Sequence, residues 1–328
     1  MLLASHAGVR HFADRSVHKP YALVLVAVLA TLGGLARLLV GPSEPPPPQA
    51  SGIWQVFDDQ QFISPLGMAA DRDGNLFVVD AGTHRVYKLT PGGEVLATFG
   101  SRGTGPGQFE RPSAVAVDVI GNIYVADTAN SRIQKLSISG TPLAQWGSLG
   151  AGAGQFNGPR GLAVDREGNV YVGDTGNDRV QKLSPTGQTV NVWGHVGSGP
   201  GEFRQPYGVA LDSEGAVYVA DHWNNRIQKL SPLGEPRAQW GTFGWTAGLF
   251  NNPRGVAVDA HGDVYVADSY NHRIQKLSPT GLPLFEWGGR GGDVGQFRRP
   301  EGLVVDDRGG LVVVDSDNIR LQRYVPSN

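Results

Sequence analysis

The chain has 328 residues and a formal net charge of −2, and only 18% of its residues are charged. This balance gives no bulk attraction to nucleic acid, and the lack of cysteine excludes disulfides, thiolate zinc sites, cysteine nucleophiles and lipid attachment through cysteine. The 47 glycines and 22 prolines are typical of many short strands joined by tight turns.

The first predicted element is a membrane-spanning helix over residues 21–40. This apolar run has about the length that crosses a bilayer core. Arg10, Arg15 and Lys19 precede it, so the positive-inside rule places residues 1–20 in the cytoplasm and the rest of the chain outside it. We interpret the helix as an uncleaved signal anchor in the cell membrane. The alternative is a signal peptide that is cut near residues 34–36, which would release a secreted protein.

A proline-rich linker follows at residues 41–51. Its four consecutive prolines, Pro45 to Pro48, favour a stiff polyproline II spacer. We expect this spacer to hold a folded domain, residues 52–328, clear of the lipid.

A repeat of 47 residues organises that domain. Three landmarks recur at this step without insertion or deletion: phenylalanines at 62, 109, 156, 203, 250 and 297, prolines at 65, 112, 159, 206, 253 and 300, and aspartates at 80, 127, 174, 221, 268 and 315. Six copies at constant spacing predict six structurally equal units.

Each unit contains four short runs with the pattern of strands. In the third copy these runs are residues 161–165, 169–173, 179–183 and 189–193. A glycine lies between the first two runs of every copy, and another lies between the third and fourth runs of the first five copies, where tight turns demand positive φ. Four-stranded meanders of this length are typical of propeller blades. The sequence therefore predicts an all-β fold, a six-bladed β-propeller of four-stranded antiparallel blades.

The two ends of the repeat region indicate that the ring is closed. The sixth copy ends at Asn328 without a fourth strand, whereas an extra strand, residues 53–57, precedes the first copy. Trp54 in this strand resembles the tryptophans of the fourth strands, such as Trp146. We expect the N-terminal strand to complete the last blade.

The repeats also resemble the NHL family. Residues 253–259 read PRGVAVD and residues 262–275 read GDVYVADSYNHRIQ, which match the repeat pattern of that family, and the match recurs across residues 62–325. Departures are mild: Ala114 replaces a glycine and Thr83 replaces an asparagine. The resemblance implies a six-bladed ring in a bacterial membrane-anchored protein. The family includes protein-binding and RNA-binding platforms, bacterial extracytoplasmic sensor domains and a related zinc lyase, so the fold does not decide the function.

Aspartate and arginine recur in every copy, which favours a structural role because a single active site needs asymmetry. We expect the aspartates to accept loop N–H groups and to pair with the arginines. The pairs are Asp80 and Arg85, Asp127 and Arg132, Asp174 and Arg179, Asp221 and Arg226, Asp268 and Arg273, and Asp315 and Arg320.

Histidine is the remaining candidate for metal binding. His84, His222 and His272 lie in loops between second and third strands, on one face of a propeller. A histidine in this loop is common in the repeat pattern, however, and the ligands of the related lyase do not map onto this sequence. We therefore assign no metal, no cofactor and no catalytic residue.

The loops that enter each blade and those between second and third strands would share one face. Cations and aromatic side chains that differ among the copies gather there, a combination typical of binding hot spots, although loops also tolerate such residues. The predicted ligand-binding face consists of Arg111, Arg160, Arg204, Tyr207, His222, Trp223, Arg254, Tyr270, His272 and Arg299.

These features predict a membrane-anchored, extracytoplasmic binding or scaffold module for a protein, peptide or glycan ligand. The alternative is a propeller enzyme such as a metal-dependent lyase. RNA binding would require a cytoplasmic domain, and a ubiquitin-ligase role would require the cysteines of a RING domain. Neither fits the predicted anchor and the composition.

Overall fold

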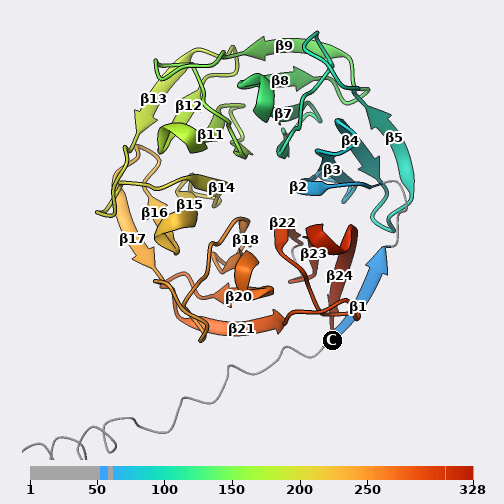
Figure 1. The fold of residues 1–328 in the computed structure, drawn as a ribbon, viewed down its shortest axis with the longest axis vertical. Helices are drawn as coiled ribbons and strands as arrows, with labels where there is room; N and C mark the ends of the chain where they lie inside the picture. Colours follow the sequence, from blue (N-terminus) through green and yellow to red (C-terminus); the bar gives the residue numbers. More distant parts are fainter. Residues whose placement is uncertain (1–51, 58–61, 307, 328) are drawn as a thin grey trace, which may run out of the picture. The chain divides into compact units, whose positions relative to one another are not determined.

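The repeats form six four-stranded antiparallel sheets around a central axis, and the predicted six-bladed all-β propeller is confirmed (Figure 1). The computed structural model describes residues 52–57, 62–306 and 308–327. The first strand of a blade lies nearest the axis and the fourth lies on the outside, as β2 and β5 show in Figure 1.

The blades follow one another along the chain. The strands of the first three blades are β2 (Pro65–Ala70), β3 (Leu76–Asp80), β4 (Arg85–Leu89) and β5 (Val95–Phe99); β6 (Ala114–Val117), β7 (Ile123–Asp127), β8 (Arg132–Leu136) and β9 (Pro142–Trp146); and β10 (Gly161–Val164), β11 (Val170–Asp174), β12 (Arg179–Leu183) and β13 (Thr189–Trp193). Those of the last three are β14 (Pro206–Leu211), β15 (Val217–Asp221), β16 (Arg226–Leu230) and β17 (Pro236–Trp240); β18 (Val256–Val258), β19 (Val264–Asp268), β20 (Arg273–Leu277) and β21 (Pro283–Gly288); and β22 (Pro300–Val305), β23 (Leu311–Asp315), β24 (Arg320–Pro326) and β1 (Gly52–Phe57).

The hydrophobic core lies between neighbouring blades. Every residue of the second strands is buried, because both faces of these strands contact another sheet. In β5 and β13, two of the fourth strands, more exposed residues alternate with less exposed ones, as expected for outer strands with one solvated face. The repeated phenylalanine of each unit is inserted between two blades, as Phe109 is among residues of blades one and two. Burial of one such side chain contributes about 1.5–3 kcal/mol.

Glycines allow the inner strands to approach closely. A Cβ atom at Gly161 would collide with the carbonyl oxygen of Tyr207 in the next blade, and one at Gly255 would collide with that of Glu301. This repeat position therefore requires a very small residue, and Ala114 is the largest that it holds.

The N-terminal strand completes the sixth blade, since β1 pairs with β24 from Gly52 with Pro326 to Phe57 with Leu321. The predicted equivalence of Trp54 with the fourth-strand tryptophans is wrong. In blade two Trp146 pairs with Ile133, and in blade six Phe57 pairs with the corresponding Leu321.

Trp54 instead packs against the rings of Phe297 and Tyr324, at centroid distances of 5.2 and 5.3 Å. The reason is the register of β1. The other fourth strands have an irregularity next to the turn that precedes them, as between Lys135 and Leu136 in blade two. This irregularity is absent from β1, which pairs continuously with β24. Trp54 therefore lies opposite Tyr324, three pairs along the strand from the place that Trp146 occupies in blade two.

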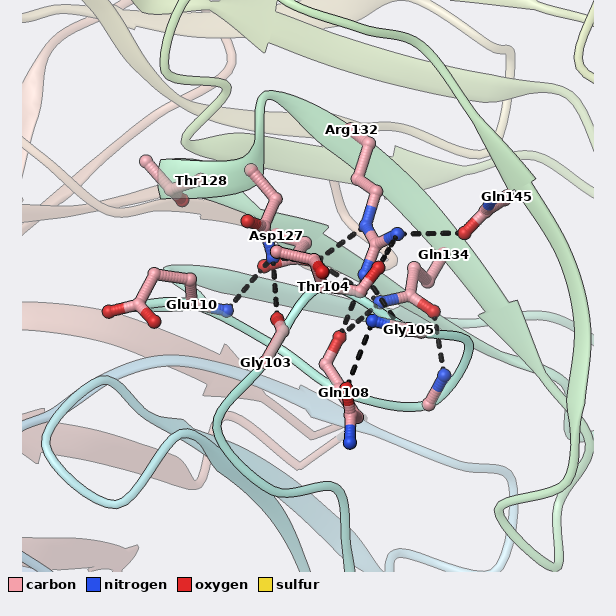
Figure 2. A network of polar contacts seen from close by, with 12 residues as sticks. Gly103, Thr104, Gly105, Gln108, Glu110, Asp127, Thr128, Arg132, Gln134 and Gln145 are labelled. Atoms are coloured by element: carbon pink, nitrogen blue, oxygen red, sulfur yellow. Dashed lines mark hydrogen bonds and ion pairs between the residues drawn. The ribbon is translucent and has the colours of Figure 1, made fainter.

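The repeated aspartates form buried networks with the loops that enter their blades (Figure 2). In blade two, the Asp127 carboxylate accepts hydrogen bonds from the backbone N–H of Glu110 (2.7 Å), from Arg132 Nε (2.7 Å) and from Gln134 Nε2 (3.1 Å). The Arg132 guanidinium in turn donates to three loop carbonyl oxygens, including that of Thr104. The corresponding ion pairs recur in blades three to six.

Blade one departs from this arrangement. Asp80 accepts hydrogen bonds from four backbone N–H groups, including those of Ile63 and Thr83. Arg85 is exposed and forms no ion pair with Asp80 in the part of the chain that the structure describes.

The predicted membrane helix and the whole of the proline-rich linker lie outside the described residues. Among the residues that are described, no helix is long and apolar enough to span a membrane.

Candidate functional site

The strand register defines which loops share a face of the propeller. Pro206 at the start of β14 pairs with Asp221 at the end of β15, and Pro300 pairs with Asp315 in the same way. The start of each first strand therefore lies where the loop between the second and third strands begins. These loops and the loops between blades form one surface, which we call the loop face.

On the loop face, the repeat position after the proline holds five different residue types in the six blades. The residue after the repeated proline is Leu66, Ser113, Arg160, Tyr207, Arg254 or Glu301, and all six line a central cavity of about 90 Å³. We call these six the mouth residues. Because every blade contributes one mouth residue, the cavity lies on the propeller axis. Because the mouth residues differ in size and charge, the cavity is an asymmetric part of a nearly symmetric ring.

Two arginines stack on one tyrosine at this mouth. The guanidinium carbon atoms of Arg160 and Arg254 lie 4.9 and 5.1 Å from the centroid of the Tyr207 ring. The ring of His222 stacks against the same tyrosine at 4.3 Å. Tyr207 is therefore contacted by three neighbouring side chains.

Arg254 joins this stack to a second group of charges. It forms an ion pair with Glu301, whose carboxylate also lies 3.5 Å from Arg299. Arg299 reaches Asp317 at 3.2 Å. Both arginines lie near the exposed ring of Tyr270, each 5.7 Å from its centroid. A connected network of cations and aromatic rings thus extends outward from the mouth.

His222 is buried beneath this network and is neutral over the physiological pH range. Its Nδ1 lies 3.3 Å from the carbonyl oxygen of Pro253, so Nδ1 carries the proton. Burial, reinforced by the charge of Arg254, lowers the pKa of His222 to about 3. Threonines at the same repeat position, such as Thr175, donate to the corresponding proline carbonyl of the next blade. His222 therefore links two blades and supports Tyr207.

We expect the His222→Thr variant to lose less stability in acid than the wild type. The unfolded imidazole takes up a proton below pH 6.5, whereas the folded one stays neutral until about pH 3. The unfolded state thus binds more protons in this window, and the wild type loses up to about 1.4 kcal/mol per pH unit as the pH falls. Urea unfolding between pH 7 and 4 measures this slope for both proteins. Equal slopes would contradict the burial of a neutral His222.

His84 and His272 have another role. In each, Nδ1 accepts a hydrogen bond from a backbone N–H group of the next blade's entry loop, that of Arg111 (3.0 Å) or Arg299 (3.1 Å). Asp178 at the same repeat position likewise accepts the N–H of Gln205. This position thus carries a link between blades. Among the described residues, no group of three histidine or acidic side chains could hold a metal ion.

The structure brings together six of the ten residues of the predicted binding face. The network contains Arg160, Tyr207, His222, Arg254, Tyr270 and Arg299. The other four lie on the loop face outside this network, and of them His272 contacts it through the backbone N–H of Arg299: Arg111, Arg204, Trp223 and His272. Trp223, 57% exposed, projects from the loop of blade four.

Sequence reasoning missed Glu301, Leu66 and Ser113 as mouth residues. The available signal was the residue after the repeated proline, whose size and charge vary among the blades. Glu301 is the most important of the three, because its carboxylate neutralises Arg254 and is itself buried.

The fold and the site define a six-bladed β-propeller with one asymmetric channel mouth. The NHL repeat model matches residues 109–136, 156–183, 203–230, 250–277 and 297–324. The chain is thus an NHL-repeat propeller with five recognised repeats. Blade one is outside these matches, in agreement with its Thr83 and its exposed Arg85. A comparison with curated protein sequences gave no match.

Solved structures share the fold at low sequence identity. A streptogramin B lyase is 16% identical with a TM-score of 0.60, over 84% of this chain and 98% of that chain. A gluconolactonase from Xanthomonas campestris is 15% identical with a TM-score of 0.62, over 87% and 97%. A protein of unknown function from Bacteroides thetaiotaomicron is 18% identical with a TM-score of 0.62, over 85% and 73%. At these identities the likeness establishes the fold alone.

Proposed function

We propose that this protein is a binding module that recognises a protein, peptide or glycan ligand through its loop face, centred on the channel mouth. The observation that carries the proposal is the contact of Arg160, Tyr207 and Arg254 at a repeat position that holds five residue types in six blades. Positions that maintain the ring repeat from blade to blade, whereas a recognition site for one ligand needs unlike residues.

The composition of the site supports recognition. Arginine and tyrosine are the residues that most often dominate binding energy, because they offer large rigid surfaces together with hydrogen-bond donors. The cavity is too small for a folded partner but large enough for one chemical group. Tyr270 and Trp223, 46% and 57% exposed, provide further contact area around it on the loop face.

The proposal includes a place in the cell. The apolar residues 21–40 with basic residues before them favour a membrane anchor with a cytoplasmic N-terminus. The propeller would then present its ligand site outside the cytoplasm, on the spacer of residues 41–51.

The test uses the full-length chain and a collection of extracellular proteins, peptides and glycans. Hydroxyl-radical footprinting with a captured ligand should show reduced modification of Tyr207 and Tyr270, and the ligand should be recovered with unchanged mass. A chelator should not alter the capture. Protection away from the loop face would contradict the site. A product of altered mass that disappears with chelator would favour the enzyme alternative.

A further inference from the structure

The channel mouth contains hydrogen-bond donors that the protein itself does not use. In the part of the chain that the structure describes, the Arg160 guanidinium forms no ion pair and no hydrogen bond, and its recorded partner is the Tyr207 ring. The Nε atom of Arg254 is buried without a hydrogen-bond partner. A buried donor without a partner costs about 1–3 kcal/mol of stability, so binding of a hydrogen-bond acceptor that reaches this donor would be favourable.

Resting on the proposed function, we propose that the mouth takes a single carboxylate group of the ligand, bound by the guanidinium groups of Arg160 and Arg254 that line it. The planar fork of a guanidinium matches the two oxygens of a carboxylate, which gives short, charge-assisted hydrogen bonds. Both arginines are already oriented by the Tyr207 ring, so little side-chain freedom is lost on binding.

The charge of the mouth selects an ion with one negative charge. Two arginines and Glu301 are the charged residues that line the cavity, and they leave one positive charge. His222 behind Tyr207 is neutral, because burial lowers its pKa. A carboxylate balances this charge. A phosphate dianion would bring a second negative charge close to the Glu301 carboxylate. Because Glu301 is buried, water screens this repulsion only weakly, and phosphate binding is unfavourable.

The size and lining of the cavity fit a carboxylate at the end of a chain. A volume of about 90 Å³ corresponds to a handful of water positions, which is sufficient for one carboxylate and its neighbouring carbon atoms. Leu66, Leu162 and Leu303 contribute apolar surface to the same lining. The ligand would therefore enter with its acidic end first and leave its remaining part over the loop face.

Glu301 is the competitor of the ligand. Its carboxylate already pairs with Arg254 and neutralises the positive charge with which the carboxylate of a ligand would pair. Removing this charge without changing the shape of the side chain should strengthen binding, whereas removing the Arg160 charge should weaken it. Opposite effects from two neighbouring substitutions are not expected from general damage to the fold.

The experiment titrates the full-length chain with propionate, propionamide and inorganic phosphate at pH 8 by ligand-observed NMR. Propionate should bind in the millimolar range or better, and propionamide and phosphate should bind at least about tenfold more weakly. Arg160→Ser, which introduces the residue of the equivalent Ser113, should weaken propionate binding about tenfold or more. Glu301→Gln should strengthen it severalfold. Arg160→Lys should lie between the wild type and Arg160→Ser, because it keeps the charge and loses the fork.

Two further probes distinguish the source of the carboxylate. N-acetylglycine represents a peptide terminus and glucuronate represents an acidic sugar; the one that binds more tightly identifies the ligand class. Phosphate binding equal to that of propionate, or propionate binding unchanged in Arg160→Ser, would overturn the carboxylate inference. The footprint of a captured ligand at Tyr207 would still support the proposed function in that case, so the two failures are distinguishable.

Discussion

Replacing Asp174 by alanine should lower the free energy of unfolding by about 3–5 kcal/mol, the largest effect that we expect from a single substitution in the repeats. The Asp174 carboxylate is fully buried and accepts hydrogen bonds from the Asn157 backbone N–H (2.7 Å), Arg179 Nε (2.7 Å) and Gln181 Nε2 (3.0 Å). Alanine would leave a largely buried arginine without its carboxylate and would remove an acceptor from three further donors, those of Asn157, Asn177 and Gln181.

Thermal and urea unfolding of the full-length chain measure this loss, which corresponds to roughly 6–20 °C in Tm. The control is a double variant in which Arg179→Met is added to Asp174→Ala. Removing the orphaned charge should recover part of the lost stability, because the two side chains act as one unit. If the stability losses of the two single substitutions simply add in the double variant, Asp174 and Arg179 are not coupled. That result would contradict the explanation that the aspartate and arginine recur because they form the kind of network shown in Figure 2.

The architecture could be predicted from the sequence because a propeller consists of copies of one structural unit, the four-stranded blade. Six copies of a 47-residue unit, with turn glycines at constant places, define the number of blades and the four strands in each. Trp54 shows the limit of that reasoning. Its aromatic side chain suggested the wrong register, because Phe57, and not Trp54, occupies the place of the fourth-strand tryptophans.

The site was predictable only in part. Differences among equivalent loop positions indicated residues that share the loop face, but residues 47 apart in sequence become neighbours only when two successive blades pack together. Arg254 and Glu301 are such a pair. The sequence also could not show that His222 is buried under Tyr207, since a histidine in an exposed loop and one between two blades follow the same residue pattern.

The most direct test of the region around the channel mouth as the binding surface compares two double variants that each remove two exposed aromatic side chains. Trp223→Ala with Tyr270→Ala changes the surface around the channel mouth. Phe243→Ala with Trp245→Ala changes the loop between blades four and five, where these rings form an exposed pair at 5.0 Å. At the positions of Trp223 and Tyr270, the other copies hold glycine, alanine or aspartate. At those of Phe243 and Trp245, they hold arginine, leucine, valine, threonine, alanine, serine or glycine. The blades therefore do not need aromatic residues at these positions, and both variants should fold.

The measurement is the binding isotherm of the captured ligand on the full-length chain for the wild type and both variants. Loss of a hot-spot aromatic costs more than about 2 kcal/mol, so the variant at positions 223 and 270 should bind at least about thirtyfold more weakly. The variant at positions 243 and 245 should bind like the wild type. Wild-type affinity in the first variant, or a thirtyfold loss confined to the second, would contradict the assignment of the binding surface to the region around the channel mouth.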